Sequence, residues 1–404
     1  MLKKLLSLTV VCFLGAFFAA GAWGEPIKIG VPLSFTGPYA ADGLGYFRGI
    51  KMAVDEINDQ GGLLGRRVEM VKFDTQDLAP ERVMQAADQL VGRENVASVH
   101  GGWAGWGQDV RAYGKYEVPF FMWDASLNSV SVIRQDPKKY SNVFQLVDTE
   151  RPLSRDMFKV MAKLPVSYQN KKMAVVNADD SWGIESAKGM IEIAEERGWE
   201  VVLHETVPYG TREWGPILTK IKSHNPAIIY VEIISTPDLI TFFRQFMKSP
   251  THSVINFGYG LSLPDFIENI GTDGDGLLGE TTGLPYPKAP TPQAQEWMNR
   301  FEKKFGANPA AGSFAVYTGV MMWAEAVRSV GEVRDYQAIN DYLLNTPYES
   351  IAGRTLKFDE DHKISTKSWP LSHLQIQEGR LVTIYHGSDN PYKDYEFLTP
   401  PWMR

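Results

Sequence analysis

The feature that most constrains the fold of this chain is a regular alternation of short apolar segments with longer segments of helical periodicity. The apolar segments are rich in Val and Ile and are expected to be strands, at 27–33, 68–74, 96–100, 118–122, 173–177, 201–205 and 228–233. The other segments are expected to be helices, at 47–60, 80–92, 181–197, 214–224, 237–247, 293–305, 317–330 and 336–345. Nearly continuous apolar strands separated by helices indicate parallel sheets covered on both faces. The sequence therefore predicts an α/β fold of doubly wound parallel sheets.

The length of the chain predicts two lobes. Its 404 residues exceed the roughly 250–300 residues at which one hydrophobic core stops growing. Crossovers between the lobes are expected near 144–151, 276–287 and 365–372, where strand-like runs end in segments rich in Pro, Gly, Ser or Thr. This assigns 25–147 and 280–368 to an N-terminal lobe, and 148–279 and 369–404 to a C-terminal lobe. The polar and aromatic segment 385–404 is expected to wrap the surface.

The first 24 residues have the pattern of a signal peptide. Lys3 and Lys4 precede an apolar run at 5–18, and Ala20-Gly21-Ala22 has the small-x-small form that signal peptidase requires. Cleavage is expected after Ala22 or Gly24, which places the mature protein in the periplasm. The alternative is an uncleaved anchor, but the apolar run is short for the ~20 residues of a membrane span.

Composition excludes several classes of function. The single cysteine, Cys12, lies in the signal segment, so the mature chain is expected to have no disulfide, catalytic thiol or cysteine metal ligand. The formal net charge of −7 argues against nucleic acid or an anionic membrane as a partner. The chain also lacks a Gly-x-Ser-x-Gly elbow, a His-Glu-x-x-His motif and a P-loop, and its seven histidines are scattered. We therefore expect no catalysis, no metal and no cofactor.

One segment is far more specific than the general pattern. In Asn58-Asp-Gln-Gly-Gly-Leu-Leu-Gly-Arg-Arg-Val-Glu69, Gly61 and Gly62 supply a left-handed helix end, and Gly65 turns the chain into the next strand. Together with 27–43 and 49–74, this segment resembles the branched-chain amino acid-binding (Leu/Ile/Val-binding protein) family of ABC transporter periplasmic substrate-binding proteins. Segments 174–202, 211–231 and 276–286 extend the resemblance over nearly the whole mature chain.

The resemblance implies a type I periplasmic binding fold, in which three crossovers join two lobes around a ligand cleft. It further implies a monomer that captures a small solute, closes by hinge motion and docks on the membrane permease subunits of an ABC importer. A ligand-sensing receptor of the same fold, feeding a signalling partner, stays open as the alternative.

In doubly wound sheets the ligand lies beyond the carboxyl ends of the strands, so the loops that follow the strands supply candidate ligand contacts. Trp103, Ala104 and Trp106 follow the strand at 96–100. The resemblance implies a carboxylate-binding hydroxyl near Trp103 or Ala104, and this chain has none there. We expect at least one of the two tryptophans in the cleft; the alternative is that both pack between loops.

The strand at 118–122 is followed by Trp123, Asp124 and Ser126. The resemblance gives Ser126 the role of the second carboxylate-binding hydroxyl of the family. Asp124 adds a negative charge where the family uses a backbone contact. Its alternative roles are capping a helix or lying solvated in a loop.

In the C-terminal lobe, the resemblance places Trp182 where an aromatic side chain covers the ligand in relatives, with packing at a helix start as the alternative. Tyr259 stands where amino acid binders place an acid against the ligand ammonium, a role that Glu232 or Asp124 could take instead. Besides Glu232, three further candidates complete the predicted site: Tyr39 and Asp42 from the first loop, and Trp369 at the third crossover.

The five tryptophans at these loops predict an aromatic-walled cleft, suited to a ring, an apolar chain or a quaternary cation. Because the two positions that recognise the charged groups of an α-amino acid are altered, leucine, isoleucine and valine are expected to bind weakly. An apolar or aromatic carboxylate, or an amino acid-like compound, is the expected solute.

Overall fold

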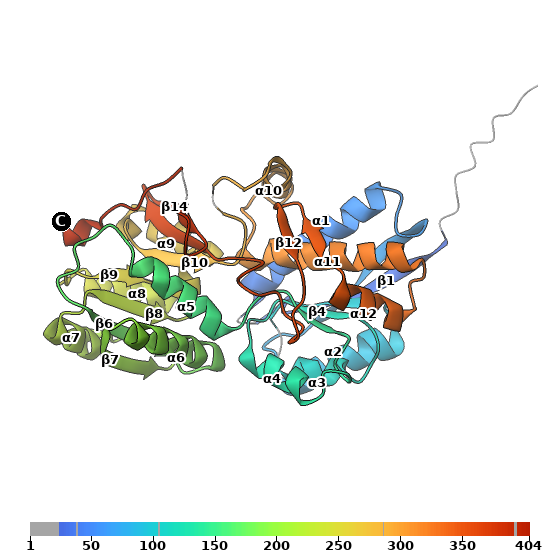
Figure 1. The fold of residues 1–404 in the computed structure, drawn as a ribbon, viewed down its shortest axis with the longest axis horizontal. Coiled ribbons are helices and arrows are strands. Elements are labelled where there is room, and N and C mark those ends of the chain that lie inside the picture. The colour runs from blue at the N-terminus through green and yellow to red at the C-terminus, as the bar shows by residue number, and fades with distance from the viewer. Residues whose placement is uncertain (1–23, 38, 104–105, 286, 392–393) are drawn as a thin grey trace, which may run out of the picture.

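The structure is a computed structural model that describes residues 24–37, 39–103, 106–285, 287–391 and 394–404. It consists of two lobes lying side by side, each with a central sheet and helices around it (Figure 1). The predicted signal peptide lies outside the described residues, except for Gly24, at which the first strand begins.

The N-terminal lobe has a wholly parallel five-stranded sheet in the order β2-β1-β3-β4-β5. Its strands are β1 Gly24–Leu33, β2 Arg66–Asp74, β3 Ser98–His100, β4 Phe120–Met122 and β5 Val143–Gln145. Its helices are α1 Ala40–Asp59, α2 Pro80–Ala87 continued by a π-helical turn at Asp88–Arg93, α3 Gln108–Tyr113, α4 Leu127–Gln135, α10 Pro292–Phe305, α11 Ala311–Val330 and α12 Tyr336–Asn345. A small hairpin, β11 Tyr348–Ser350 and β12 Arg354–Leu356, follows α12.

Helices cover both faces of this sheet because its strand residues are apolar on both sides. Along β4, Phe121 belongs to the large core cluster that also contains α1 and α11 residues, whereas Phe120 and Met122 belong to the cluster formed with α2 and α3. Successive strand side chains point to opposite faces, so the continuous apolar run produces a double-covered sheet.

The C-terminal lobe has a seven-stranded sheet in the order β14-β13-β10-β9-β8-β6-β7. Its strands are β6 Lys172–Ala178, β7 Glu200–Val207, β8 Ile228–Glu232, β9 Val254–Asn256, β10 Leu278–Thr281, β13 Ser372–Gln377 and β14 Arg380–His386. Its helices are α5 Glu150–Met161, α6 Ser181–Glu196, α7 Gly215–His224, α8 Thr236–Phe246 and α9 Pro264–Ile270, with short 3₁₀ helices at η2 Gly258–Ser262, η3 Gly271–Gly274 and η4 Pro401–Met403.

This second sheet differs from the expectation of parallel strands alone. β13 runs antiparallel to β10 and forms an antiparallel hairpin with β14. The hairpin turns at Glu378 and Gly379, whose φ angles of 51° and 68° give the left-handed backbone that two-residue hairpin turns require. β10 continues in this sheet as far as Thr281, and the division of the lobes at 279/280 stays a prediction.

Two of the chain segments that pass between the lobes are bound to each other. Gln145 at the end of β5 donates its N–H to the His362 carbonyl at 2.8 Å and accepts from the Ile364 N–H at 3.0 Å. Next to them, the largely buried Lys363 ammonium lies 2.9 Å from the Asp148 carboxylate. These hydrogen bonds and this largely buried ion pair hold the first crossover against the chain segment that leads into the third.

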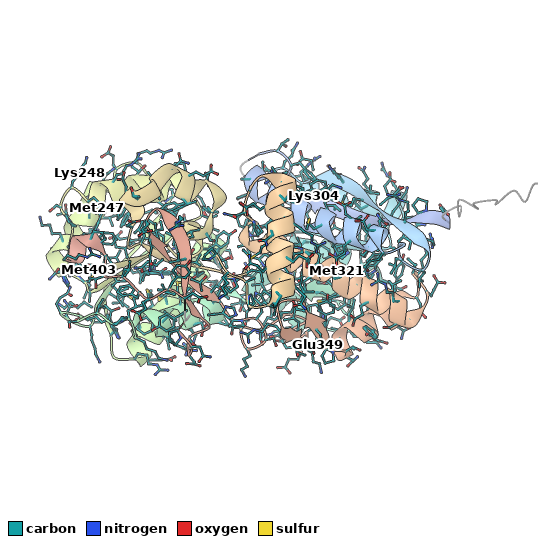
Figure 2. The ribbon with its side chains drawn as sticks, turned by 90° about the horizontal axis from the view of Figure 1, so that it is seen from above. Met247, Lys248, Lys304, Met321, Glu349 and Met403 are labelled. Atoms are coloured by element: carbon teal, nitrogen blue, oxygen red, sulfur yellow. The ribbon has the colours of Figure 1, made fainter. Side chains whose placement is uncertain are left out.

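The end of the chain packs more deeply than a surface wrap. Trp402 makes edge contacts with Phe243 and Phe246, its Nε1 donates to the Ser253 carbonyl at 2.8 Å, and Met403 is buried. Seen from above, Met403 lies on the same lobe as Met247 and Lys248, and Lys304, Met321 and Glu349 mark the other lobe (Figure 2). Of the helices in the described ranges, none is both long and apolar enough to cross a bilayer.

Candidate functional site

The site is a cavity between the two lobes, with about 660 Å³ of empty space including its opening to solvent. From the N-terminal lobe it is lined by Tyr39, Trp103, Trp106, Trp123, Asp124, Ala125 and Val147. From the C-terminal lobe it is lined by Leu153, Asp180, Trp182, Tyr209, Ile234, Tyr259, Glu280 and Thr282. Most of these residues follow the carboxyl end of a strand, the position at which open α/β sheets bind ligands.

Aromatic rings in mutual contact form the N-terminal wall. Trp103 lies edge-on to Tyr39, with ring centroids 5.5 Å apart. Behind it, Tyr46 of α1 contacts Trp103 at 6.3 Å and Trp123 at 5.5 Å. Rings held at such distances restrain one another, so this wall is shaped before a solute arrives.

Trp106 is positioned by an unusual backbone. Its φ is 44°, in the left-handed region that residues with a side chain seldom occupy, and Gly107 follows with a φ of 97°. Gly107 donates its N–H to the buried Asp109 carboxylate at 3.1 Å, just before α3 begins. Strained backbone of this kind is frequent at ligand sites, and here it places a tryptophan side chain at the cavity.

The opposite wall includes Trp182, at the start of α6. Asp180 caps this helix by accepting the Gly183 N–H, and the Trp182 indole Nε1 donates to Glu232 Oε1 at 3.1 Å. Glu232 also accepts a hydrogen bond from the Tyr230 hydroxyl, and burial raises the pKa of Glu232 to about 7. The indole is therefore fixed in orientation by a buried carboxyl behind it.

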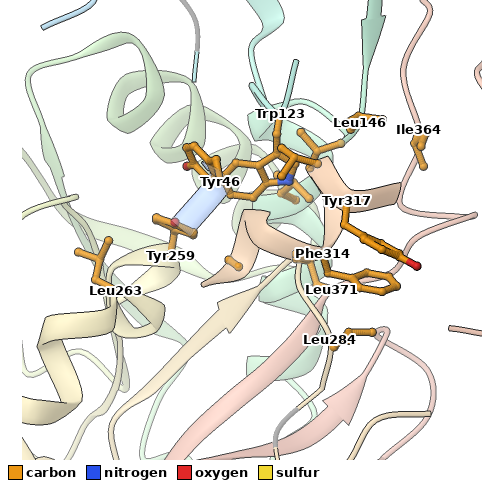
Figure 3. Close-up of a cluster of buried hydrophobic side chains, with 14 of the residues drawn as sticks. Tyr46, Trp123, Leu146, Tyr259, Leu263, Leu284, Phe314, Tyr317, Ile364 and Leu371 are labelled. Carbon is orange, nitrogen blue, oxygen red and sulfur yellow. The ribbon is translucent and has the colours of Figure 1, made fainter. Parts of the chain in front are cut away.

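Tyr259 joins the two walls. It lies in η2 of the C-terminal lobe, yet its ring centroid is 6.1 Å from that of Trp103 and 6.0 Å from that of Trp123. Its hydroxyl donates to Asp42 of α1 at 3.2 Å. Figure 3 shows Tyr259, Tyr46 and Trp123 converging within the buried cluster. The lobes are therefore in contact across the cleft.

The charged groups of the lining are all acidic. Asp124 and Glu280 are buried, and burial together with neighbouring carboxyls raises the pKa of each well above its usual range. Asp180 is half-buried and accepts hydrogen bonds from the Gly183 N–H and the Tyr209 hydroxyl. The cavity thus combines aromatic side chains with carboxyl groups, and the described lining has no basic side chain.

Seven of the residues predicted from the sequence come together in the lining: Tyr39, Trp103, Trp106, Trp123, Asp124, Trp182 and Tyr259. Asp42 and Glu232 lie directly behind it, each hydrogen-bonded to a lining residue. Their contact with a solute stays a prediction.

Two predicted residues are placed away from the lining, and a third is not described. Ser126 is fully buried and caps α4 by accepting the Ser129 N–H at 3.2 Å. Trp369 stacks on Phe314 at 5.6 Å and donates its Nε1 to the Thr282 carbonyl, so it supports the loop that carries a lining residue. Ala104 lies outside the described residues.

Eight lining residues were missed by the sequence analysis: Ala125, Val147, Leu153, Asp180, Tyr209, Ile234, Glu280 and Thr282. Ile234 directly follows a predicted strand, and Asp180 and Tyr209 lie three and four residues beyond the ends of two others, so the strand-end rule that found Trp123 could have found all three. Glu280 lies in β10 and Thr282 directly after it. This strand was not predicted, because its four residues Leu278–Thr281 include Gly279.

Comparison with known proteins decides the family. The model of the periplasmic binding protein family matches residues 26–375. The chain belongs to this family. It is 27% identical to the Leu/Ile/Val-binding protein homolog 7 of Brucella suis biovar 1 (strain 1330), over 95% of this chain and 96% of the relative.

Solved structures agree. A candidate branched-chain amino acid ABC transporter protein from Silicibacter pomeroyi superimposes with a TM-score of 0.85 at 27% identity, covering 94% of this chain and 100% of the other. An ABC transporter solute-binding protein from R. palustris in complex with benzoate superimposes with a TM-score of 0.72, covering 92% of this chain and 98% of the other. At 18% identity, that likeness shows the fold alone. The predicted family, the α/β two-lobed fold and the role of a solute-binding protein of an ABC transporter are confirmed.

Proposed function

We propose that this chain is the exported capture subunit of an ABC importer, which encloses one small organic solute between its lobes and delivers it to membrane permease subunits. The solute carries an apolar or aromatic body, and the chain acts as a monomer without a catalytic step. The signal peptide predicted at the N-terminus sends it to the periplasm.

One observation carries this proposal: an aromatic cavity whose walls come from different lobes and are joined by Tyr259. A solute seated between Trp103 or Trp123 on one lobe and Trp182 on the other contacts both lobes only when they are closed. Binding energy is then coupled to closure, because a ligand shifts a two-state equilibrium by its differential affinity for the two states. A permease that docks on the closed form would thereby recognise the loaded protein.

The proposal is tested with protein purified from the periplasm of the native organism. Mass spectrometry after denaturation is expected to release about one small solute per chain, and the refolded protein is expected to bind that solute again. Cells that lack the chain are expected to lose uptake of the radiolabelled solute. Protein that carries no solute, together with unchanged uptake in the deletion strain, would contradict the proposal.

A further inference from the structure

The charges that line the cavity all have one sign. Among its fifteen described lining residues there are three carboxylic acids, Asp124, Asp180 and Glu280, and no Lys, Arg or His. A carboxylate solute would therefore enter next to carboxyl groups without a basic side chain to receive it. A carboxylate placed beside an ionised carboxyl group in a buried site is strongly unfavourable.

Glu280 is the most informative of the three acids. It lies in β10, is only 2% exposed and lines the cavity, yet its Oε2 has no hydrogen-bond partner among the described residues. Two residues further along, Thr282 also lines the cavity, and its buried hydroxyl has no hydrogen-bond partner in the described part of the chain. Buried polar groups are nearly always hydrogen-bonded, and leaving one unsatisfied costs about 1–3 kcal/mol. A ligand that donates to these oxygens would remove this cost.

The other two acids add charge in different ways. Asp124 is 4% exposed and accepts one hydrogen bond, from the Ser129 hydroxyl to Oδ2 at 3.1 Å. Asp180 uses its two oxygens for the Gly183 N–H and the Tyr209 hydroxyl, so it contributes negative potential rather than a free acceptor.

The aromatic lining favours the same kind of ligand. Seven of the fifteen lining residues are Trp or Tyr, and the faces of these rings attract cations, most strongly when water is excluded. Aromatic walls with carboxyl groups between them are the chemistry by which proteins hold organic ammonium groups, whereas an anion would meet both unfavourably.

Resting on the proposed function, we propose that the captured solute is an organic ammonium compound, whose charged nitrogen lies against Glu280 and Asp124 while its apolar or aromatic body lies against the tryptophans. This narrows the range of solutes expected from the sequence to those that carry a cationic nitrogen and no carboxylate. It assigns Glu280 of β10, which the sequence analysis missed, as the residue that determines the charge preference.

The ionisation of Glu280 provides an independent readout. Burial and the neighbouring Glu232 and Asp156 raise the pKa of Glu280 well above its usual range, which favours the protonated carboxyl group in the ligand-free cavity. A cation placed against it favours the ionised form, and binding is then accompanied by proton release. A ligand held by packing alone would leave this proton in place.

The test uses two series of ligands with the same body and different charge. One series is 2-phenylethylamine, phenylalanine and 3-phenylpropanoate; the other is 3-methylbutylamine, leucine and 4-methylpentanoate. Isothermal titration calorimetry of the full mature protein at pH 7 is expected to give, in at least one series, an amine that binds tenfold or more tightly than its carboxylate. Titration in buffers of different ionisation enthalpy is expected to show proton release with the amine.

Glu280→Gln keeps the shape of the side chain and removes its charge. This variant is expected to bind the amine at least tenfold more weakly, to release fewer protons and to bind the carboxylate no more weakly than the unaltered protein. Glu296→Gln, at an exposed position of α10 outside the lining, is the matched control and is expected to change none of these values.

The outcomes separate the two proposals. If a carboxylate or an amino acid binds more tightly than the amine of its series, the cation preference is overturned, while capture of a solute stands. If neither amine binds, the cation preference is likewise overturned, and the solute recovered from native protein then decides whether capture itself stands. Equal affinities of Glu280→Gln and the unaltered protein for the amine remove Glu280 from the site.

Discussion

The hydroxyl of Tyr259 donates a hydrogen bond to Oδ1 of Asp42, 3.2 Å away, although the two residues belong to different lobes. Asp42 lies in the first turn of α1, and Tyr259 lies in η2 after β9. The same tyrosine ring contacts Trp103 and Trp123. Opening of the cleft must break all of these contacts, so this pair contributes to the closed state and not to the open one.

Replacing Tyr259 with Phe is expected to weaken solute binding while leaving the ligand-free protein folded. The ring and its packing stay, and only the hydroxyl is removed, which corresponds to a net loss of about 0.5–1.5 kcal/mol, or roughly 2- to 12-fold in affinity. Calorimetry with the solute recovered from native protein measures the change. Tyr116→Phe is the control, because its hydroxyl bonds Asp88 within the N-terminal lobe, away from the cleft. An unaltered affinity of Tyr259→Phe would show that the cross-cleft bond does not stabilise closure.

Removal of the solute is expected to enlarge the protein without unfolding it. The first and third crossovers are bound together through Gln145 and the Lys363–Asp148 ion pair, so the lobes should rotate as rigid bodies about this region. Small-angle X-ray scattering is expected to give a smaller radius of gyration with solute than without it, at identical helical content by circular dichroism. An equal radius in the two states at saturating solute is the result that would rule out hinge closure.

The stability of the ligand-free protein is expected to fall as the pH rises from 5 to 8. Burial raises the pKa of Glu150 to about 8, while in the unfolded chain a glutamate titrates near 4.3. The folded state therefore holds this proton more tightly, and the stabilisation is fully present below about pH 4 and is lost as the pH rises through 8. Asp42 and Glu232, whose pKa values burial raises to about 7, act in the same direction.

Urea denaturation at pH 5, 6, 7 and 8 measures this slope, which for one such group is at most about 1.4 kcal/mol per pH unit. Glu150→Gln keeps an acceptor for the Leu127 N–H, which bonds Glu150 Oε2 at 2.7 Å, and removes the titration. Its stability is expected to decline less steeply than that of the unaltered protein, whereas the exposed control Glu81→Gln should follow the original slope. Parallel slopes for all three proteins would show that Glu150 does not carry a raised pKa.

Much of the fold could be predicted because many of its strands lie within runs of apolar residues. β6 and β8, for example, are buried on both faces, and a strand of this kind can be identified from its apolar sequence alone. The hairpin of β13 and β14 was not predicted, because polar residues such as His373, Gln375 and Thr383 are buried in it. Burial of these residues depends on the antiparallel partner strand and on the C-terminal segment: the Gln375 side chain donates to the Leu398 carbonyl.

The site could be predicted only in part, for a physical reason that Ser126 and Glu280 illustrate. Ser126 stands at the right place along the chain, but its hydroxyl caps α4, and sequence position alone does not reveal which neighbour a hydroxyl bonds. Glu280 belongs to a four-residue strand that neither periodicity nor length distinguishes from a loop. The loop carrying Trp123 was identified because the three residues of β4 lie within the apolar run 118–122, which has no glycine.

Trp182 offers the sharpest test of the cavity itself. Trp182→Ala removes an aromatic wall, and loss of its buried area and ring contacts should weaken solute binding by on the order of 2–4 kcal/mol, or roughly 30-fold or more. The structure adds a second consequence, since the Trp182 indole donates to the buried Glu232 carboxyl. Without this donor the ligand-free protein should also lose about 1–3 kcal/mol of stability.

Trp402→Ala separates these two effects. Trp402 packs against Phe243 and Phe246 and donates to the Ser253 carbonyl, so its removal should lower stability without touching the cavity. Both variants are measured by calorimetry for affinity and by urea denaturation for stability. Trp182→Ala is expected to lower both affinity and stability, whereas Trp402→Ala is expected to lower stability alone. If Trp182→Ala instead behaves like Trp402→Ala, with lower stability and unaltered affinity, its indole only packs at the start of α6. The solute must then be held by Trp103, Trp106 or Trp123 without an opposing tryptophan.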